Sequence, residues 1–230
     1  MGGQRRPPLR GGPGSASWVL PVIAGAGGLA TAIALGVRRR RLERVDEQTS
    51  RHLLRSPFCV STIPDELRRI GVAPGLVVLD VGCGPGTFLE EAARTAGRGG
   101  EARGVEPDAE WAEVARSRLR SQGLGRVAVD VAPTDRLPYG DGAFDLAYLV
   151  AMLGRVRDRE GTLREVLRVL KPGGRLAVTE HLADSHYVPA SLVRRFCLAA
   201  GFEMAESGLG RWDHTSAFRK PVPAAVAATA

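Results

Sequence analysis

Cysteine is scarce in this sequence, with three in 230 residues, and the three stand far apart at Cys59, Cys83 and Cys197. Their odd number and wide spacing exclude a disulfide scaffold and a Cys-rich zinc site, and fit a reducing compartment. Aromatic residues are also few, at 5% of the chain. Apolar residues nevertheless make up 44% and charged residues 25%, which is the composition of a globular chain rather than a disordered or fibrous one. The length leaves room for one domain with a full core.

The main part of the chain lacks an excess of charge of either sign. The net charge of +7 comes entirely from residues 1–55, which hold ten Arg against three acidic residues. Residues 56–230 hold 22 basic and 22 acidic groups. A neutral domain has no general electrostatic attraction for a phosphate backbone, so we expect no nucleic-acid partner.

A charge-free segment accounts for the basic cluster beside it. The segment 18–37 is twenty residues long and carries no charged side chain, and four consecutive Arg (38–41) follow directly. As a helix, this segment would be about 30 Å long, the thickness of a bilayer core. Arg head groups at its end can reach anionic lipid. The positive-inside bias then predicts a single-pass membrane protein whose C-terminal domain is cytoplasmic.

Two other interpretations of residues 18–37 stay open. A secretory signal is one, although its core is usually shorter and four Arg make a poor start for a mature protein. An apolar tail is the other, since the segment is rich in Ala and Gly. Around it we predict a disordered tail at 1–17, a basic juxtamembrane linker at 38–55, a domain at 56–220 and a second disordered tail at 221–230.

Beyond the linker, strand-like and helix-like patterns alternate, which predicts a mostly parallel α/β sheet. The expected strands lie at 76–81, 101–106, 126–131, 144–150 and 175–180, with a closing hairpin at 202–206 and 215–219. The expected helices lie at 86–96, 109–122, 159–170 and 188–200. In the second helix we expect one apolar face of Trp111, Val114, Ala115 and Leu119. Four breaker-type residues (171–174) end the third helix.

The strongest motif is Asp80 followed by Gly82, Gly84 and Gly86, at the end of the first strand and the start of a helix. Glycines there let the backbone pass close to a ligand, and the helix start offers free N–H groups. Glu106 follows about twenty residues on, at the end of the second strand, where a carboxylate can bind both ribose hydroxyls. The pattern predicts a nucleoside-bearing cofactor at the carboxyl ends of the strands.

The spacing of the glycines favours one cofactor. A dinucleotide fold expects G-x-G-x-x-G, with a helix N-terminus facing a pyrophosphate. This chain has G-x-G-x-G, with Asp80 two residues ahead of the first glycine. A carboxylate there repels pyrophosphate and suits an ammonium group. S-adenosylmethionine carries an ammonium and a ribose and no phosphate.

Four stretches together resemble the class I S-adenosylmethionine-dependent methyltransferases of the ubiquinone/menaquinone-biosynthesis-like type. They are VLDVGCGPG (78–86), GVEP (104–107), LPYGDGAFDLAYLV (137–150) and LREVLRVLKPGGRLAVTE (163–180). The resemblance covers roughly residues 56–220 and implies a Rossmann-like, seven-stranded sheet with helices on both faces and a reversed last strand. It also implies Asp80 near the methionine amino group, Gly82 and Gly84 beneath it, and Glu106 on the ribose. The full expected cofactor set is Asp80, Gly82, Cys83, Gly84, Gly86, Glu106, Pro107 and Asp135.

The sequence departs from the family at two places. Members usually carry an Asp four residues before the LPF-like tripeptide, which accepts from the adenine amino group, and here that position is Pro133. Asp135 or backbone atoms are the possible substitutes. Relatives also often carry a His pair after the fourth strand, where this chain reads Leu-Gly-Arg-Val at 153–156. The Cys83 side chain has no base beside it in the sequence and is interpreted as a spacer.

The methyl acceptor is the least determined part of the prediction. In-line alignment of donor and acceptor supplies much of the acceleration of methyl transfer, and a base is needed only if the acceptor must lose a proton. The weak candidates for a catalytic side chain are Tyr148, Arg155, His181, His186 and Tyr187. An anchor with a basic collar favours a lipid-like or other small apolar acceptor. We expect no metal.

Two other classes of protein stay open. A cofactor-binding but inactive scaffold would keep the glycine turn and explain Pro133 and Arg155. A nicotinamide oxidoreductase is opposed by Asp80 and by the glycine spacing.

Overall fold

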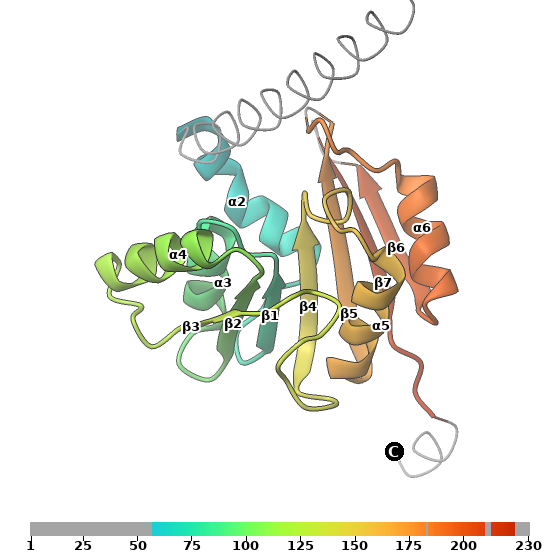
Figure 1. The fold of residues 1–230 in the computed structure, drawn as a ribbon, viewed down its shortest axis with the longest axis horizontal. Coiled ribbons are helices and arrows are strands. Elements are labelled where there is room, and N and C mark those ends of the chain that lie inside the picture. Colours follow the sequence, from blue (N-terminus) through green and yellow to red (C-terminus); the bar gives the residue numbers. More distant parts are fainter. Residues whose placement is uncertain (1–56, 183, 210–212, 224–230) are drawn as a thin grey trace, which may run out of the picture. The chain divides into compact units, whose positions relative to one another are not determined.

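The computed structural model describes residues 57–182, 184–209 and 213–223. Helices and strands alternate over most of this range, as expected (Figure 1). The helices are α2 (Pro57–Ile70), α3 (Thr87–Ala96), α4 (Ala109–Ser121), α5 (Arg159–Val169) and α6 (Ala190–Ala199). The strands are β1 (Val77–Val81), β2 (Glu101–Glu106), β3 (Ala128–Val131), β4 (Phe144–Val150), β5 (Leu170–His181), β6 (Glu203–Leu209) and β7 (Asp213–Arg219).

The strands form one seven-stranded sheet in the order β3-β2-β1-β4-β5-β7-β6. The first five strands pair in parallel, and β7 pairs antiparallel with both β5 and β6. The predicted seven-stranded sheet with a reversed last strand is therefore confirmed, as is the closing hairpin. Chain order reverses between β1 and β4, and in open α/β sheets such a switch point is where ligands bind, beside the carboxyl ends of the strands.

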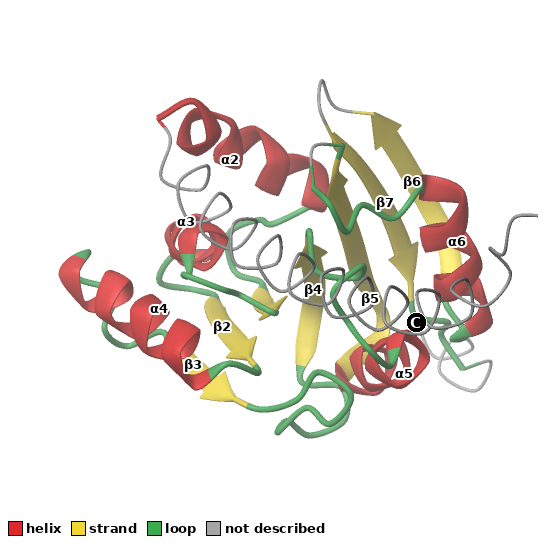
Figure 2. Cartoon of the chain, turned by 45° about the horizontal axis from the view of Figure 1, so that its top comes forward, coloured by secondary structure: helices red, strands yellow, loops and turns green. Residues whose placement is uncertain are grey.

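Helices cover both faces of the sheet, with α2, α3 and α4 grouped apart from α5 and α6 (Figures 1 and 2). The larger core lies between α5, α6 and one face, where Leu163, Val193 and Phe218 pack together. On the other face, Leu67 of α2 and Phe88 of α3 pack over Tyr148. Helices on both faces therefore shield the strands from solvent, as is usual for a parallel sheet.

The buried face of α4 differs from the predicted one. The structure buries Ala112, Ala115 and Leu119, while Val114 is 40% exposed. Ala112, Ala115 and Leu119 follow the i, i+3, i+4 spacing of a helix stripe, and Val114 falls beside it. The expectation for Val114 was wrong because small residues, Ala112 above all, form the contact with the sheet.

Helix α2 is an element that the sequence analysis did not predict. Its buried side chains include Ile63, Leu67 and Ile70, which repeat at helical spacing. The glutamate between them, Glu66, is also buried. The position of α2 against β5, β7 and α3 brings this carboxylate to the sheet.

Strand β5 begins earlier than predicted. The breaker-type residues at 171–174 do end α5, at Val169, but they belong to β5 itself, which starts at Leu170. Gly173 N–H donates to the Lys220 carbonyl at 3.0 Å, and Lys220 N–H donates to the Gly174 carbonyl at 2.9 Å. Pairing with the chain after β7 therefore holds these residues in the sheet, which local turn propensity alone does not foresee.

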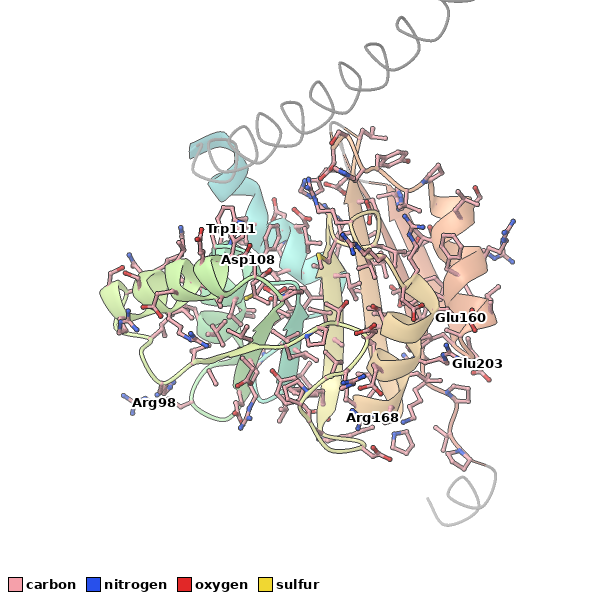
Figure 3. The ribbon with its side chains drawn as sticks, in the orientation of Figure 1. Arg98, Asp108, Trp111, Glu160, Arg168 and Glu203 are labelled. Atoms are coloured by element: carbon pink, nitrogen blue, oxygen red, sulfur yellow. The ribbon has the colours of Figure 1, made fainter. Side chains whose placement is uncertain are left out.

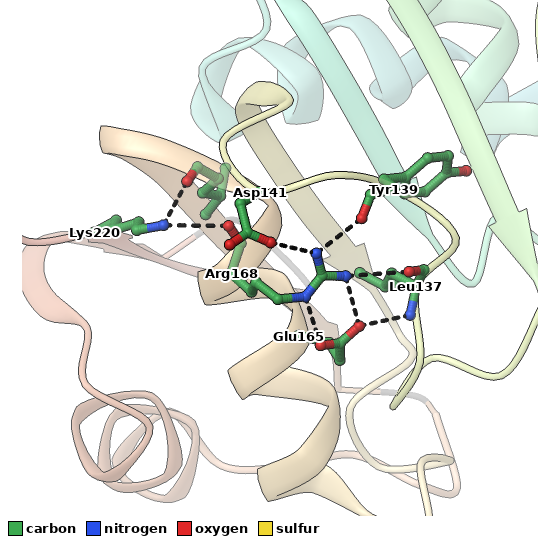
Figure 4. A network of polar contacts seen from close by, with 7 residues as sticks. Leu137, Tyr139, Asp141, Glu165, Arg168 and Lys220 are labelled. Atoms are coloured by element: carbon green, nitrogen blue, oxygen red, sulfur yellow. Dashed lines mark hydrogen bonds and ion pairs between the residues drawn. The ribbon is translucent and has the colours of Figure 1, made fainter.

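Residues 137–150 and 163–180, two of the four stretches that resemble the family, contact each other at the end of the sheet opposite the glycine turn. Arg168 of α5 donates to the carbonyl oxygens of Leu137 and Tyr139 at 3.2 and 2.8 Å and to Asp141 at 2.7 Å (Figure 4). Glu165 binds the same guanidinium and accepts from Leu137 N–H at 2.8 Å. These residues thus fasten the loop before β4 to the last turn of α5.

None of the helices in the described ranges is long and apolar enough to cross a membrane. The predicted spanning segment at 18–37, the tail at 1–17, the linker at 38–55 and most of the tail at 221–230 lie outside the described residues. These predictions and the predicted domain limits therefore stay predictions.

Candidate functional site

The switch point of the sheet places Asp80 of β1 beside Tyr148 of β4. The two residues are partners in the strand register, and the Tyr148 hydroxyl donates to Asp80 Oδ2 at 3.0 Å. Asp80 is 3% exposed and Tyr148 is fully buried. Tyr148 was predicted as a weak catalytic candidate, and in the structure its hydroxyl is engaged by Asp80.

Burial sets the charge state of Asp80. Removal from water raises the pKa of this carboxyl to about 8, although the Tyr148 hydrogen bond acts in the opposite direction, and Glu106 nearby adds to the rise. A carboxyl that is costly to ionise in a buried position is stabilised in its charged form by a cation brought next to it. The chemistry of Asp80 therefore suits a positively charged group such as an ammonium.

The turn after β1 brings the backbone into the left-handed region at Gly82, Gly84 and Gly86, with φ of 76°, 51° and 75°. A Cβ at Gly82 would lie 2.6 Å from Met152 Sδ, so only glycine fits between the turn and Met152. The residue before Met152, Ala151, is the only described non-glycine residue with a positive φ, at 49°. Such strain collects at ligand sites, and here it directs Met152 over the turn.

Glu106 connects the turn to the next helix. One of its carboxylate oxygens accepts from Gly84 N–H at 2.9 Å, and the other from Asp108 N–H at 3.1 Å. Asp108 in turn caps α4 by accepting from the N–H groups of Glu110 and Trp111, and Asp108 and Trp111 lie together at the start of that helix (Figure 3). Each carboxylate oxygen keeps a further lone pair, so Glu106 can accept the two hydroxyls of a ribose.

Cys83 and Pro107 take part in this region in different ways. The Cys83 side chain is buried with Leu89 and Ala115, and burial raises the pKa of its thiol. Its sulfur points into the core, which leaves only its backbone for a ligand. Pro107 is exposed directly after Glu106, at the carboxyl end of β2.

The turn after β3 carries the predicted adenine contact. Pro133 and Asp135 are both exposed there. Thr134 between them is buried, and its hydroxyl lies 2.8 Å from that of Thr162 at the start of α5. Val131 of β3 is the register partner of Glu106, so this turn follows the strand next to the ribose carboxylate. Asp135 therefore lies on the expected edge of the sheet with its side chain outward.

Three of the predicted acceptor-side residues gather around the loop between β5 and α6. Arg155 forms an ion pair with Asp184 at 3.0 Å, and the other oxygen of Asp184 accepts from His186 N–H at 2.7 Å. A Cβ at Gly154 would collide with the His186 carbonyl, so glycine is required for this loop to pack against the chain after β4. Tyr187 follows in the same loop, and its ring meets His214 edge to face at 5.6 Å.

The structure adds two buried polar residues that the sequence analysis did not single out, Glu180 and His214. They are register partners on β5 and β7, and both hold Val188 at the end of this loop. Val188 N–H donates to Glu180 at 3.4 Å, and the Val188 carbonyl lies 2.9 Å from His214 Nε2. Among the described residues, Glu180 Oε1 and His214 Nδ1 have no hydrogen-bond partner. Burial raises the pKa of Glu180 to about 7.

His181, the fifth weak candidate, points to the opposite face of β5 from Glu180. Its Nε2 lies 2.9 Å from Glu66 Oε1 on α2. The five candidates are therefore not one cluster. Tyr148 belongs to the Asp80 pair, His181 to Glu66, and the remaining three to the loop after β5. Two sequence signals could have added residues to the list of candidates. Glu180 stands at the end of a strand, and Glu66 lies among apolar residues at helical spacing.

Two shallow hollows on the described surface lie away from these residues. One is lined by residues that include Arg116 and Val129, and the other by residues that include Glu101 and Tyr139. The Asp80 and Glu106 carboxylates instead line the carboxyl edge of the sheet around the glycine turn.

This edge fits S-adenosylmethionine better than a dinucleotide. Asp80 supplies a buried carboxyl for an ammonium, and Glu106 supplies acceptors for a ribose. A Cβ at Gly84 would meet no atom within 4 Å, so the turn is open where a ligand approaches. The N–H groups of Gly82 and Cys83 both donate to the Val105 carbonyl, and a pyrophosphate would need such groups free. Fold and site therefore define a Rossmann-like domain built for S-adenosylmethionine.

Comparisons with known proteins agree with this class. Residues 79–178 match the family model described as a methyltransferase domain. The chain is 39% identical over 132 residues to Methyltransferase GfsG of Streptomyces halstedii, covering 56% of this chain and 47% of that protein. It is 36% identical over 111 residues to the ubiquinone/menaquinone biosynthesis C-methyltransferase UbiE of Idiomarina loihiensis, covering 48% and 44%. The chain thus spans about half the length of these relatives.

A solved structure extends the likeness to the whole sheet. The S-adenosylmethionine-dependent methyltransferase from Aquifex aeolicus superposes with a TM-score of 0.65 at 20% identity, covering 69% of this chain and 89% of that chain. This likeness shows the fold, and the matched residues 79–178 contain the glycine turn and Glu106. The domain belongs to the class I S-adenosylmethionine-dependent methyltransferases, and S-adenosylmethionine is the methyl donor of that class.

Proposed function

We propose that this protein transfers a methyl group from S-adenosylmethionine to a small apolar acceptor with an ionisable hydroxyl, at a membrane surface. The observation that carries the proposal is the presence of two carboxyl groups at the glycine turn: Glu106 accepts from Gly84 N–H within the turn, and Asp80, which precedes the turn, accepts from the Tyr148 hydroxyl. A buried cation receptor and a ribose receptor at one switch point match the two ends of the donor.

The chain's own residues hold and orient the donor. Asp80 binds the ammonium, Glu106 the ribose hydroxyls, and Met152 covers Gly82, which keeps the backbone of the turn close to the ligand. The donor supplies an electrophilic methyl group on a sulfonium sulfur. Alignment of the acceptor with the methyl–sulfur bond accounts for much of the acceleration, because it replaces an encounter in solution by a fixed geometry.

The acceptor class is supported by two lines of reasoning. The name of the UbiE relative refers to the biosynthesis of ubiquinone and menaquinone. These are quinones, and a quinone in its reduced form carries phenolic hydroxyls. The sequence of residues 18–37, followed by four Arg, predicts an anchor that would keep the domain beside a bilayer on its cytoplasmic side. A reduced quinone precursor satisfies both.

The cofactor part is tested by calorimetric titration of S-adenosylmethionine and of NAD into the full chain, with Asp80→Ala and Glu106→Ala beside it. We expect binding of S-adenosylmethionine alone, weakened by both substitutions. Binding of NAD in preference would instead favour the oxidoreductase interpretation. Binding without methyl transfer to any acceptor of the class would favour the inactive scaffold.

The anchor is tested separately. The full chain is expressed with and without residues 18–37, and its membrane fraction is washed with alkaline carbonate. We expect the full chain to stay with the membrane and the deletion variant to be released. Release of both would contradict the anchor while leaving the methyltransferase proposal intact.

A further inference from the structure

His181 and Glu66 form a carboxylate–imidazole pair at the end of β5. His181 Nε2 lies 2.9 Å from Glu66 Oε1. The Glu66 side chain is almost completely buried on α2, whereas 34% of the His181 side chain is exposed. A buried carboxylate behind a half-exposed imidazole is the arrangement in which one group orients the other and only the outer group meets a ligand.

The contact with Glu66 determines which ring nitrogen is free. A carboxylate accepts, so the proton of the neutral imidazole lies on Nε2. The lone pair is then on Nδ1, and Nδ1 hydrogen bonds to no residue in the part of the chain that the structure describes. His181 therefore offers an unshielded acceptor for a proton.

The charged groups around His181 come from three elements. Glu66 reaches it from α2, Asp213 is its register partner on β7, and Asp184 lies in the following loop. Arg69 binds Asp213 through two hydrogen bonds of 2.9 Å, and Arg155 binds Asp184. Burial opposes protonation of His181, but Glu66, with Asp213 and Asp184, outweighs it and raises the pKa of the imidazole.

The strand register places His181 on the face and edge where the donor binds. Asp80 pairs with Tyr148, and Tyr148 pairs with Ala177. His181 is four residues after Ala177, so all four side chains share one face of the sheet. The neighbouring chain after β4 is fastened to β5, because Ala151 N–H donates to the Thr179 carbonyl at 2.8 Å. The next residue, Met152, covers Gly82.

We propose that His181 is the general base of the methyl transfer and that Glu66 is its positioning residue. The inference rests on the proposed function. Nδ1 of His181 takes the proton of the acceptor hydroxyl as the acceptor's oxygen, or its ring carbon in conjugation with it, bonds to the methyl carbon. The methyl–sulfur bond breaks and its electron pair stays on sulfur. The products are the methylated acceptor, S-adenosylhomocysteine and a His181 imidazolium; on the carbon route the ring proton leaves afterwards to restore the aromatic ring.

The Glu66–His181 pair favours acceptors that must lose a proton during methyl transfer. A general base assists most when the acceptor is weakly acidic, as phenols and enols are. Thioethers and tertiary amines accept a methyl group without deprotonation and gain nothing from His181. The site therefore favours phenol-like over thioether-like acceptors.

The first experiment needs no acceptor. Imidazole resonances of the full chain, which contains four His, are titrated by NMR, and the His181 signal is identified by its loss in His181→Gln. We expect a pKa above the ordinary 6.5 that falls in Glu66→Gln, because the carboxylate that favours the imidazolium is removed. Asp65→Asn is the matched control, since Asp65 is exposed on the same helix and paired with Arg68. A His181 pKa that Glu66→Gln leaves unchanged would overturn the pairing.

The second experiment measures methyl transfer to 1,4-naphthoquinol between pH 5.5 and 9. We expect kcat/KM to rise with pH through the His181 pKa, because only the neutral imidazole accepts a proton. Glu66→Gln should move the rise of kcat/KM to lower pH, and Glu66→Asp should restore part of the wild-type pH profile. His181→Gln should lower kcat about 100-fold or more.

The outcomes separate the two proposals. If His181→Gln binds S-adenosylmethionine and keeps the wild-type pH profile of kcat/KM, His181 is not the general base. Absence of transfer by the wild-type chain, despite donor binding, would overturn the acceptor class of the proposed function. The NMR titration then judges the Glu66–His181 pair by itself.

Discussion

The hydroxyl of Tyr148 donates to Asp80 Oδ2 at 3.0 Å, across the two strands between which the order of the chain reverses. This hydrogen bond joins β1 to β4 at the switch point of the sheet and holds the Asp80 carboxyl of the candidate site. It favours the ionised form of a carboxyl whose pKa burial raises to about 8. We therefore expect this buried pair to contribute to the strength of donor binding.

Removal of that hydroxyl weakens donor binding. In Tyr148→Phe the pKa of Asp80 rises further, so ionising it for an ammonium costs more. We expect the Kd for S-adenosylmethionine at pH 7 to increase about tenfold, by the size of one hydrogen bond to a charged group. Calorimetry measures it. Tyr139→Phe is the control, because the Tyr139 hydroxyl makes a similar bond of 2.9 Å to Asp130 rather than to Asp80. Equal effects of the two substitutions would contradict this role.

Donor binding releases a proton. In the free protein at pH 6.5 the Asp80 carboxyl is protonated, since its pKa is about 8, and an ammonium favours the ionised form. Affinity should therefore rise up to about tenfold per pH unit between pH 5.5 and 7.5. Titration in phosphate and in imidazole buffer should show about one proton released. Asp80→Asn should abolish the release; an unchanged proton count there would assign it to another group.

Glu180 makes stability fall as pH rises. Its folded pKa is about 7 against an ordinary 4.5, so its stabilising contribution is complete below pH 4.5 and is lost as pH rises to about 7. Glu180→Gln cannot ionise, so it avoids this loss of stability. We expect a gain of about 2 kcal/mol in unfolding free energy at pH 8 and little change at pH 4.5. Urea unfolding at both pH values measures it.

The control for this prediction is Glu203→Gln. Glu203 is exposed on β6 (Figure 3), so its substitution should leave the pH dependence of stability unchanged. A gain in Glu180→Gln that is the same at both pH values would show that packing, and not ionisation, is responsible.

Arg168 is expected to be a stabilising residue without a direct part in donor binding. Arg168→Met removes the donor for the carbonyls of Leu137 and Tyr139, and should lower the free energy of unfolding by about 2–4 kcal/mol. Arg164→Met is the matched control on the same helix, because the Arg164 side chain is 62% exposed and should cost under about 0.5 kcal/mol. Chemical denaturation measures both. Donor affinity of the folded Arg168→Met chain should match wild type.

The sequence by itself determined the sheet and the cofactor edge. Local periodicity located β2 and β4 at their observed residues, and the glycine spacing behind Asp80 pointed to an ammonium rather than a pyrophosphate. These features are local because a strand's burial pattern and a turn's positive φ are set by adjacent residues.

Only the tertiary structure decided the partners of the acidic and basic side chains. Glu66 meets His181 across 115 positions of sequence, and Glu180 and His214, register partners on β5 and β7, both bind the backbone of Val188. The extension of β5 through Gly173 depends in the same way on Lys220. Contacts of this kind follow from the packing of α2 and β7 against β5. No local pattern encodes them, because their energy comes from burial and pairing between segments that are far apart in the chain.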